Sequence, residues 1–336
     1  GDGYPDLSGG LLYYISDGHT TIPGGPVDFG DTQTPGAGDF LAWTGDFDPG
    51  IEGHGTLTAS NVVGQAVING KAPKFNDLPG NGTIPGMVLG GAPNAKLAPM
   101  GDIYFSFSNS TQFAYLLTNE YGVQVTSNSY GTSTSDNDGM DASSIEADSI
   151  NDGFGDLTTS VFSTGNGAPG YGTATAPAPL SGIQVGASTN FGSTGWDSIA
   201  NYSQVTDNDV IEWSNRGPGA NGRNGVDVVA DGSYAPGDAT LNTILDGQNA
   251  WVSWGDPRRS TPVTVGAVAL IEQAYKKAHG TWPTEDQVKT FLKSGAQDLG
   301  YEPWIQGAGS VDAGKSVAAA AGSASTISPT EWRPGT

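Results

Sequence analysis

The sequence predicts a three-layer α/β fold with a mostly parallel central sheet, contained in one domain that spans residues 1–336. Short apolar segments alternate with helix-like segments and are joined by short connections, as is typical of a parallel sheet with helices on both faces. The longest expected helix covers residues 263–278, a stretch that is apolar at first and polar towards its end.

The remaining elements follow in order. Strands are expected at residues 11–15, 95–100, 122–128, 160–163 and 183–187, each a short apolar run bounded by glycine or polar residues. Further helices are expected at residues 54–63, 111–120, 140–151 and 284–294, the last with Thr284 as its N-cap. Residues 20–50 and 64–90, rich in glycine and proline, are predicted to be surface loops.

Composition limits the classes of partner. The chain has 13 Lys+Arg against 35 Asp+Glu, a net charge of -22, and such a surface repels nucleic-acid phosphates. It contains no cysteine, which excludes disulfides and thiolate metal sites, and no apolar run long enough to span a membrane. The start at Gly1, without Met or signal peptide, indicates processing, so an upstream segment or propeptide is an expected partner.

Three short motifs carry candidate chemistry. His54, in Gly53-His54-Gly55-Thr56, begins a helix of small residues, where a general base could face a cleft. Asn166, between two glycines at a strand exit, could donate its side-chain amide to a developing oxyanion. Residues 129–131, Ser129, Tyr130 and Gly131, follow a strand end. Alone, the first motif is more often a capping or loop histidine and the second a plain Asn-Gly turn, while the third is equally often a polar strand terminus.

Together and in this order, the motifs resemble the subtilisin-like serine peptidase family, in particular its pyrolysin-like branch. The resemblance covers residues 50–320 well and the first 50 poorly, and residues 325–336 form a tail. It implies that His54 is the general base, that Asn166 is the oxyanion donor, and that residues 129–131 line a cleft for an extended peptide or protein substrate. One departure is Leu57, where the family usually has a second histidine.

A sharper departure lies at the expected nucleophile. The family has a serine at a helix N-terminus, four residues before a proline, and counting back from Pro262 gives Arg258. Arginine has no nucleophilic oxygen and stays protonated. Ser260 lies about 200° around the helix axis from this position and should face away from His54, while Ser253 is expected to pack in a strand.

The carboxylate that should orient His54 is predicted to be Asp17, at the end of the strand at residues 11–15. Asp46 and Asp48 are weaker candidates, and the true aspartate could also lie upstream of Gly1. The resemblance also implies structural Ca²⁺, for which Asp2 and Asp6 form a fragment of an acidic loop. No organic cofactor is expected.

Two function classes remain open. In one, the protein is an extracellular or cell-surface serine endopeptidase whose working form has serine at position 258. In the other, the sequence is correct as written and the domain is an extracellular pseudopeptidase with a structural or binding role. The sequons at Asn81, Asn109 and Asn201 lend an exterior location only weak support. As written, the chain is predicted to be inactive.

Overall fold

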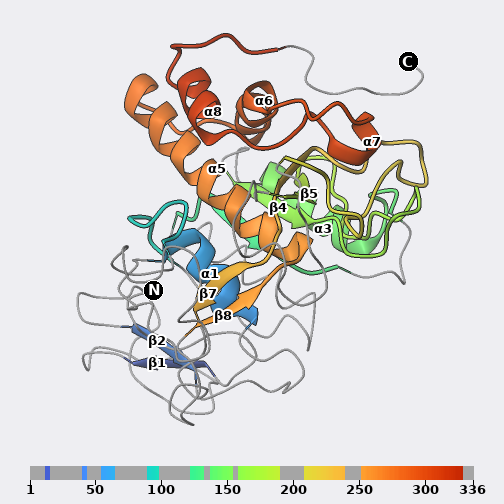
Figure 1. Ribbon diagram of the computed structural model, residues 1–336. Coiled ribbons are helices and arrows are strands. Elements are labelled where there is room, and N and C mark those ends of the chain that lie inside the picture. Colours follow the sequence, from blue (N-terminus) through green and yellow to red (C-terminus); the bar gives the residue numbers. More distant parts are fainter. Residues whose placement is uncertain are drawn as a thin grey trace.

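The computed structural model describes residues 12–15, 40–43, 54–64, 89–97, 122–131, 137–153, 158–189, 208–238 and 251–327. Its centre is a sheet of four parallel strands in the order β3 (Val125–Asn128), β4 (Thr159–Ser163), β5 (Ile183–Ser188) and β6 (Val228–Asp231) (Figure 1). Every residue of β4 and β5 is buried, which parallel strands require when both faces of the sheet are covered.

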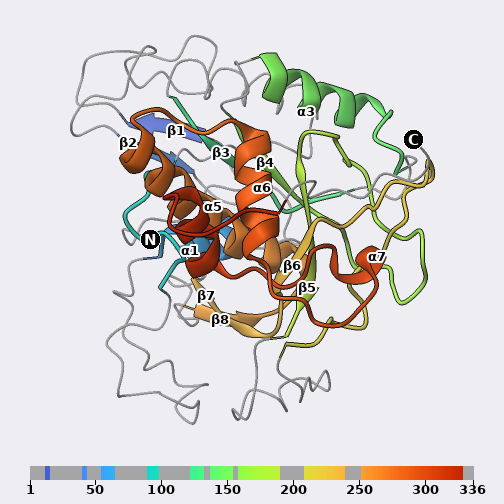
Figure 2. The same cartoon turned by 90° about the horizontal axis from the view of Figure 1, so that it is seen from above.

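Helices lie on both faces of this sheet. Val161 of β4 packs in the main hydrophobic core with Val268 and Ile271 of α5 (Pro257–His279). The neighbouring Ser160 points to the opposite face, where its hydroxyl donates to Asn151 of α3 (Ala142–Gly153) at 2.7 Å. This alternation along one strand produces the three-layer α/β arrangement that the sequence predicts (Figure 2).

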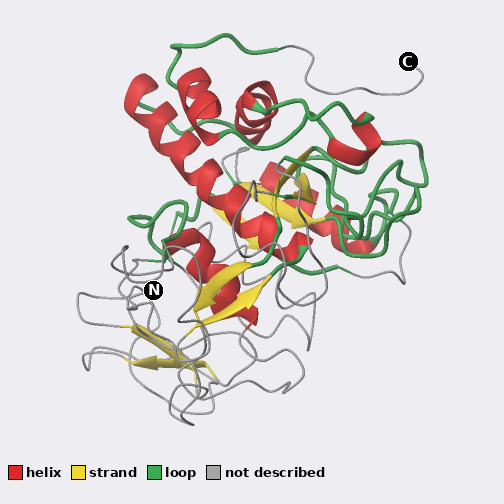
Figure 3. Ribbon diagram, in the orientation of Figure 1, coloured by secondary structure: helices red, strands yellow, loops and turns green. Residues whose placement is uncertain are grey.

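The long helix α5 organises the other helices. α1 (His54–Val63), α6 (Glu285–Gly295) and α8 (Ala313–Ala320) all pack against it, whereas the short α7 (Pro303–Gln306) lies apart (Figure 3). α6 begins at the predicted N-cap, Thr284, which forms a full capping box with Gln287. None of the described helices is long and apolar enough to cross a membrane.

Two antiparallel pairs complete the described strands. β1 (Leu12–Ile15) pairs with β2 (Phe40–Trp43). β7 (Ala235–Asp238) pairs with β8 (Trp251–Trp254), which leads directly into α5. The β7–β8 pair therefore positions the N-terminus of α5.

Most expected elements are present, with shifted ends. α5 starts at residue 257 rather than 263, because Asp256 caps it and Pro257 occupies its first turn. The strand expected at residues 95–100 is wrong over its described part: residues 95–97 are not extended in a sheet, because the chain turns with Ala95 N–H bonded to Ala92 O at 2.9 Å. The helix expected at residues 111–120 lies outside the described residues.

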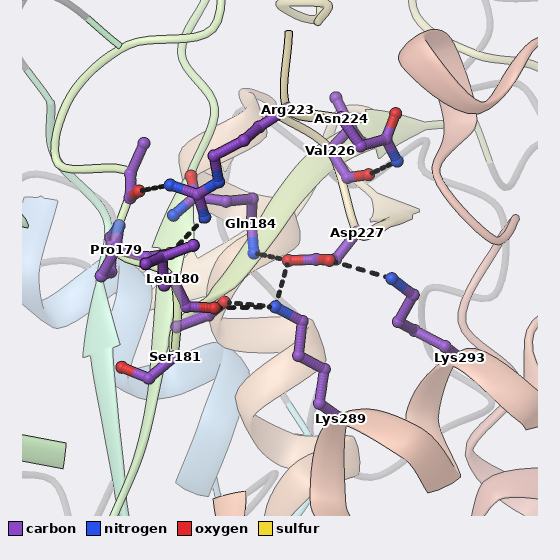
Figure 4. Close-up of polar contacts among 12 residues, drawn as sticks. Pro179, Leu180, Ser181, Gln184, Arg223, Asn224, Val226, Asp227, Lys289 and Lys293 are labelled. Atoms are coloured by element: carbon purple, nitrogen blue, oxygen red, sulfur yellow. Dashed lines mark hydrogen bonds and ion pairs between the residues drawn. The ribbon is translucent and has the colours of Figure 1, made fainter. Parts of the chain in front are cut away.

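A buried ion network joins α6 to the sheet (Figure 4). Asp227, just before β6, accepts from Lys293 Nζ at 3.1 Å and from the backbone N–H of Gln184 at 2.8 Å, and pairs with Lys289 Nζ at 3.4 Å. Lys289 also donates to the carbonyl of Gly182 at 3.0 Å. The two ammonium groups hold the pKa of Asp227 at about 2, against the opposing effect of its burial, so this carboxylate is charged and fully bonded.

Candidate active site

His54 is the first residue of α1 and lies against the start of α5. Its ring meets the ring of Trp254, the last residue of β8, edge to face, with the centroids 5.6 Å apart and the planes at 78°. One turn later Leu57 is buried, with its side chain beside Gly237 of β7. A Cβ added to Gly237 would lie 2.8 Å from Leu57 and 2.6 Å from Trp254, so glycine permits this close packing. Leu57 is therefore a packing residue of the wall behind His54.

His54 is held in the neutral form. Burial, and then the positive charge of Arg258, lower the pKa of His54 to about 4. Its Nε2 atom is buried and has no hydrogen-bond partner among the described residues. A neutral imidazole with a vacant Nε2 can accept a proton, which is what a general base must do.

Arg258 is the second residue of α5, at the helix N-terminus that faces His54. Asp256 is the N-cap, and its Oδ1 accepts the backbone N–H of Arg258 at 2.7 Å. The side chain of Arg258 is half-buried. The next residue, Arg259, turns away and is buried in an ion pair with Asp231 at 2.8 Å. The two adjacent arginines thus have different surroundings, and Arg258 is the one beside the histidine.

Pro262 connects the helix to the predicted peptide cleft. Lacking an N–H, this proline inside α5 leaves the carbonyl of Arg258, four residues earlier, without its helical hydrogen bond. That carbonyl accepts instead from the hydroxyl of Ser129 at 2.9 Å. The proline thereby fixes the start of α5 to the end of β3.

The turn after β4 carries Asn166, whose side chain reaches the N-cap of α5. Gly165 has φ +91°, a conformation that favours glycine. The buried Asn215 braces the turn, since its side-chain amide donates to Thr164 O at 2.7 Å and its backbone N–H to Gly165 O at 3.0 Å. The side chain of Asn166 is left exposed, and its Nδ2 donates to Oδ2 of Asp256 at 2.5 Å.

The side chains of Ser129 and Tyr130 make contacts within the protein. The Tyr130 side chain turns inward, where it meets Phe162 edge to face and its hydroxyl donates to Asn128 at 3.0 Å. Gly131 lies against Thr175, whose Oγ1 would be 2.5 Å from an added Cβ. A side chain at position 131 would therefore collide with the opposite wall.

The structure brings His54, Arg258, Asn166 and Ser129 to one place, around the N-terminus of α5. Ser260 lies elsewhere, with its Oγ fully buried against Gly232. Asp256 was not among the residues picked out from the sequence, although an Asp-Pro pair before a helix is a typical N-cap and first-turn pattern.

Several expected groups lie outside the described residues. They include Asp17, Asp46 and Asp48 as partners for His54, and the acidic loop at Asp2 and Asp6. No group of three potential metal ligands comes together within the part of the chain that the structure describes. The aspartate of the triad and structural calcium therefore stay predictions.

Chemically, the site has a neutral histidine that can act as a base, and amide donors at a helix N-terminus that can bind an anion. Position 258 itself provides a cation and no hydroxyl. Acyl transfer needs an attacking oxygen or sulfur beside the base, and the guanidinium at position 258 supplies neither.

Comparisons with known proteins agree with this architecture. The chain resembles the solved self-cleaved protease domain of PatA, at 18% identity, with 80% of this chain and 83% of that one covered and a TM-score of 0.56. It also resembles the prenylagaramide maturation protease PagA (18% identity, 79% and 81% covered, TM-score 0.53) and a lanthipeptide protease (18% identity, 90% and 80% covered, TM-score 0.53).

A search of curated proteins gives no match. The family model described as the subtilase family, Peptidase_S8, matches residues 41–310, which is most of the chain. The chain belongs to the subtilase family.

Proposed function

We propose that this domain, as its sequence is written, binds extended peptides outside the cell without cleaving them. The observation that carries the proposal is Arg258, which stands at the N-terminus of α5 beside His54, where a subtilase needs a serine hydroxyl. The exterior location rests only on the three sequons and on the resemblance.

The peptide would bind along residues 129–131. These residues follow β3, an outer strand of the four-stranded described sheet, and Gly131 allows the chain to pack closely against Thr175. A peptide can add to such a segment through its backbone, with little dependence on side chains. The solved relatives include proteases named for peptide maturation, which supports peptides as the ligand class.

The test measures binding and cleavage together. The purified chain should bind a fluorescent extended peptide and leave both that peptide and casein intact. Gly131→Val should weaken binding at least tenfold, because its Cβ meets Thr175 at 2.5 Å. Gly314→Ala, which has only a 3.4 Å contact with Asp312 in α8, is the matched control and should bind normally. Serine-inhibitor-sensitive cleavage by this chain would contradict the proposal.

One observation favours a second candidate, an active peptidase with serine at position 258 in its working form. Ser129 bonds to the carbonyl of Arg258, Asn166 bonds to the nearby Asp256, and the charge of Arg258 acts on His54, whose buried Nε2 makes no hydrogen bond to a described residue. A mass measurement of residues 251–275 in protein isolated from its source decides between arginine and serine at this position.

A further inference from the structure

The two anion donors of the site are both occupied by one internal carboxylate. Asn166 Nδ2 donates to Oδ2 of Asp256 at 2.5 Å, and the backbone N–H of Arg258 donates to Oδ1 at 2.7 Å. A side-chain amide and a backbone N–H can stabilise an oxyanion in acyl transfer when both donate to it. Here the two donors bind the two oxygens of one carboxylate.

Ordinary helix capping explains only half of this contact. An N-cap aspartate needs one oxygen to accept the N–H two residues later, which Oδ1 of Asp256 does. The second oxygen reaches a turn that lies 90 residues earlier in the chain and belongs to the sheet. Asp312, the N-cap of α8, makes only local bonds, to Lys315 of the same helix. The bridge to Asn166 is thus a feature of the site and not a requirement of the cap.

We infer that Asp256 fills the oxyanion-binding position of this subtilase and keeps it from stabilising a reacting carbonyl. This inference rests on the proposed function, in which Asn166 and the N-terminus of α5 face the reacting group. Its consequence is that the site carries two independent defects. Position 258 lacks the nucleophile, and position 256 supplies an anion where the transition state would place its own.

The surroundings hold the carboxylate in place. Burial raises the pKa of Asp256, and the backbone N–H and the positive charge of Arg258 oppose this rise by favouring the charged carboxylate. The buried Asn215 braces the backbone of the turn that carries Asn166. A substrate carbonyl, which is a weaker acceptor than a carboxylate, would have to displace this charged contact.

The test uses four variants, R258S, R258S/D256G, R258S/N166A and R258S/D256G/N166A, and the rate at which each reacts with a fluorophosphonate. In this reaction the serine oxygen attacks phosphorus, fluoride leaves, His54 takes the hydroxyl proton, and the phosphonyl oxygen enters the oxyanion position. Glycine remains an acceptable N-cap, so D256G should keep α5 intact.

We expect D256G to accelerate the reaction of R258S by about 10²–10³-fold, the value of one oxyanion donor. N166A should then remove most of this gain in R258S/D256G, and should have little effect in R258S, where Asp256 already occupies the amide. Equal rates for R258S and R258S/D256G, with the same loss on N166A in both, would overturn the inference.

If none of the four variants reacts, the proposed function is unaffected because it requires no catalysis, and the contact is then judged without catalysis. In the chain as written, the side-chain amide resonance of Asn166, assigned by its loss in N166A, should shift when D256G is introduced. An Asn166 resonance that stays in place in D256G would refute the occupied site whatever the rates are.

Discussion

Two aspartates, Asp227 and Asp256, differ in how far their surroundings compensate the charge of a buried carboxylate. Asp227, at the junction of β6 and α6, is matched by two lysines and a backbone N–H, and its pKa falls to about 2. Asp256, at the start of α5, is held by one amide and one N–H, and burial outweighs them, so its pKa is raised. The charge of Asp227 is therefore balanced by nearby cations. The carboxylate of Asp256 is buried with less compensation, which lowers the stability of the fold.

The largest expected effect is at the compensated site. Asp227→Asn removes the carboxylate that pairs with both Lys289 and Lys293, whose side chains are only 7% and 5% exposed. Unpairing buried charges of this kind costs about 3–5 kcal/mol, and denaturant unfolding should record that loss. Lys315→Ala removes an ion pair whose lysine is 64% exposed, and as a control it should change the free energy of unfolding by less than about 1 kcal/mol. Similar losses in both variants would contradict the comparison.

A third buried carboxylate, Glu272 of α5, has no compensating cation among the described residues. Burial raises its pKa to about 8 from an ordinary 4.5, and Thr159 donates only a long hydrogen bond of 3.4 Å. Between these two values the folded state holds a proton that the unfolded chain has released, so stability falls as the pH rises from 4.5 to 8.

Glu272→Gln should therefore flatten this part of the stability–pH profile, by on the order of 2 kcal/mol across the window. Thermal unfolding at several pH values measures it. Glu302→Gln, at an exposed position, is the control that should follow the parent profile. A Glu272→Gln profile that runs parallel to the parent profile from pH 4.5 to 8 would show that Glu272 is compensated after all.

The smallest expected effect distinguishes the role of Asp256 as a helix N-cap from its role in filling the oxyanion-binding position. Asp256→Ala and Asp312→Ala each remove an N-cap and should each lower the unfolding free energy by about 1 kcal/mol. Only Asp256→Ala should also alter the environment of Asn166. If the loss at Asp256 greatly exceeds the loss at Asp312, the bridge to Asn166 has a major structural role that the present account does not assign to it.

Much of the fold could be predicted from local pattern. The buried strands β4 and β5 are short segments in which apolar residues alternate or mix with small polar ones, and Thr284 marks the start of α6 through its capping box, so these elements were found close to their observed ends. The start of α5 was placed six residues too late, because two arginines after Pro257 obscure a helix that Asp256 in fact caps.

The site was predicted only in part, for a physical reason. His54, Asn166, Ser129 and Arg258 could each be proposed from family motifs, and the structure brings them together around α5. The bridge from Asp256 to Asn166 joins residues 90 positions apart, and no periodicity or spacing encodes such a contact. It depends on how β4 and α5 meet in three dimensions.

The central claim is that this chain cannot form a covalent adduct at the start of α5. Incubation of the purified protein with a fluorophosphonate probe, followed by intact mass and mapping of residues 251–275, tests it most directly. The account predicts an unmodified segment whose mass fits arginine at position 258. A phosphonyl adduct within that segment would contradict the account, because it would require a reactive serine at the place that the sequence gives to Arg258.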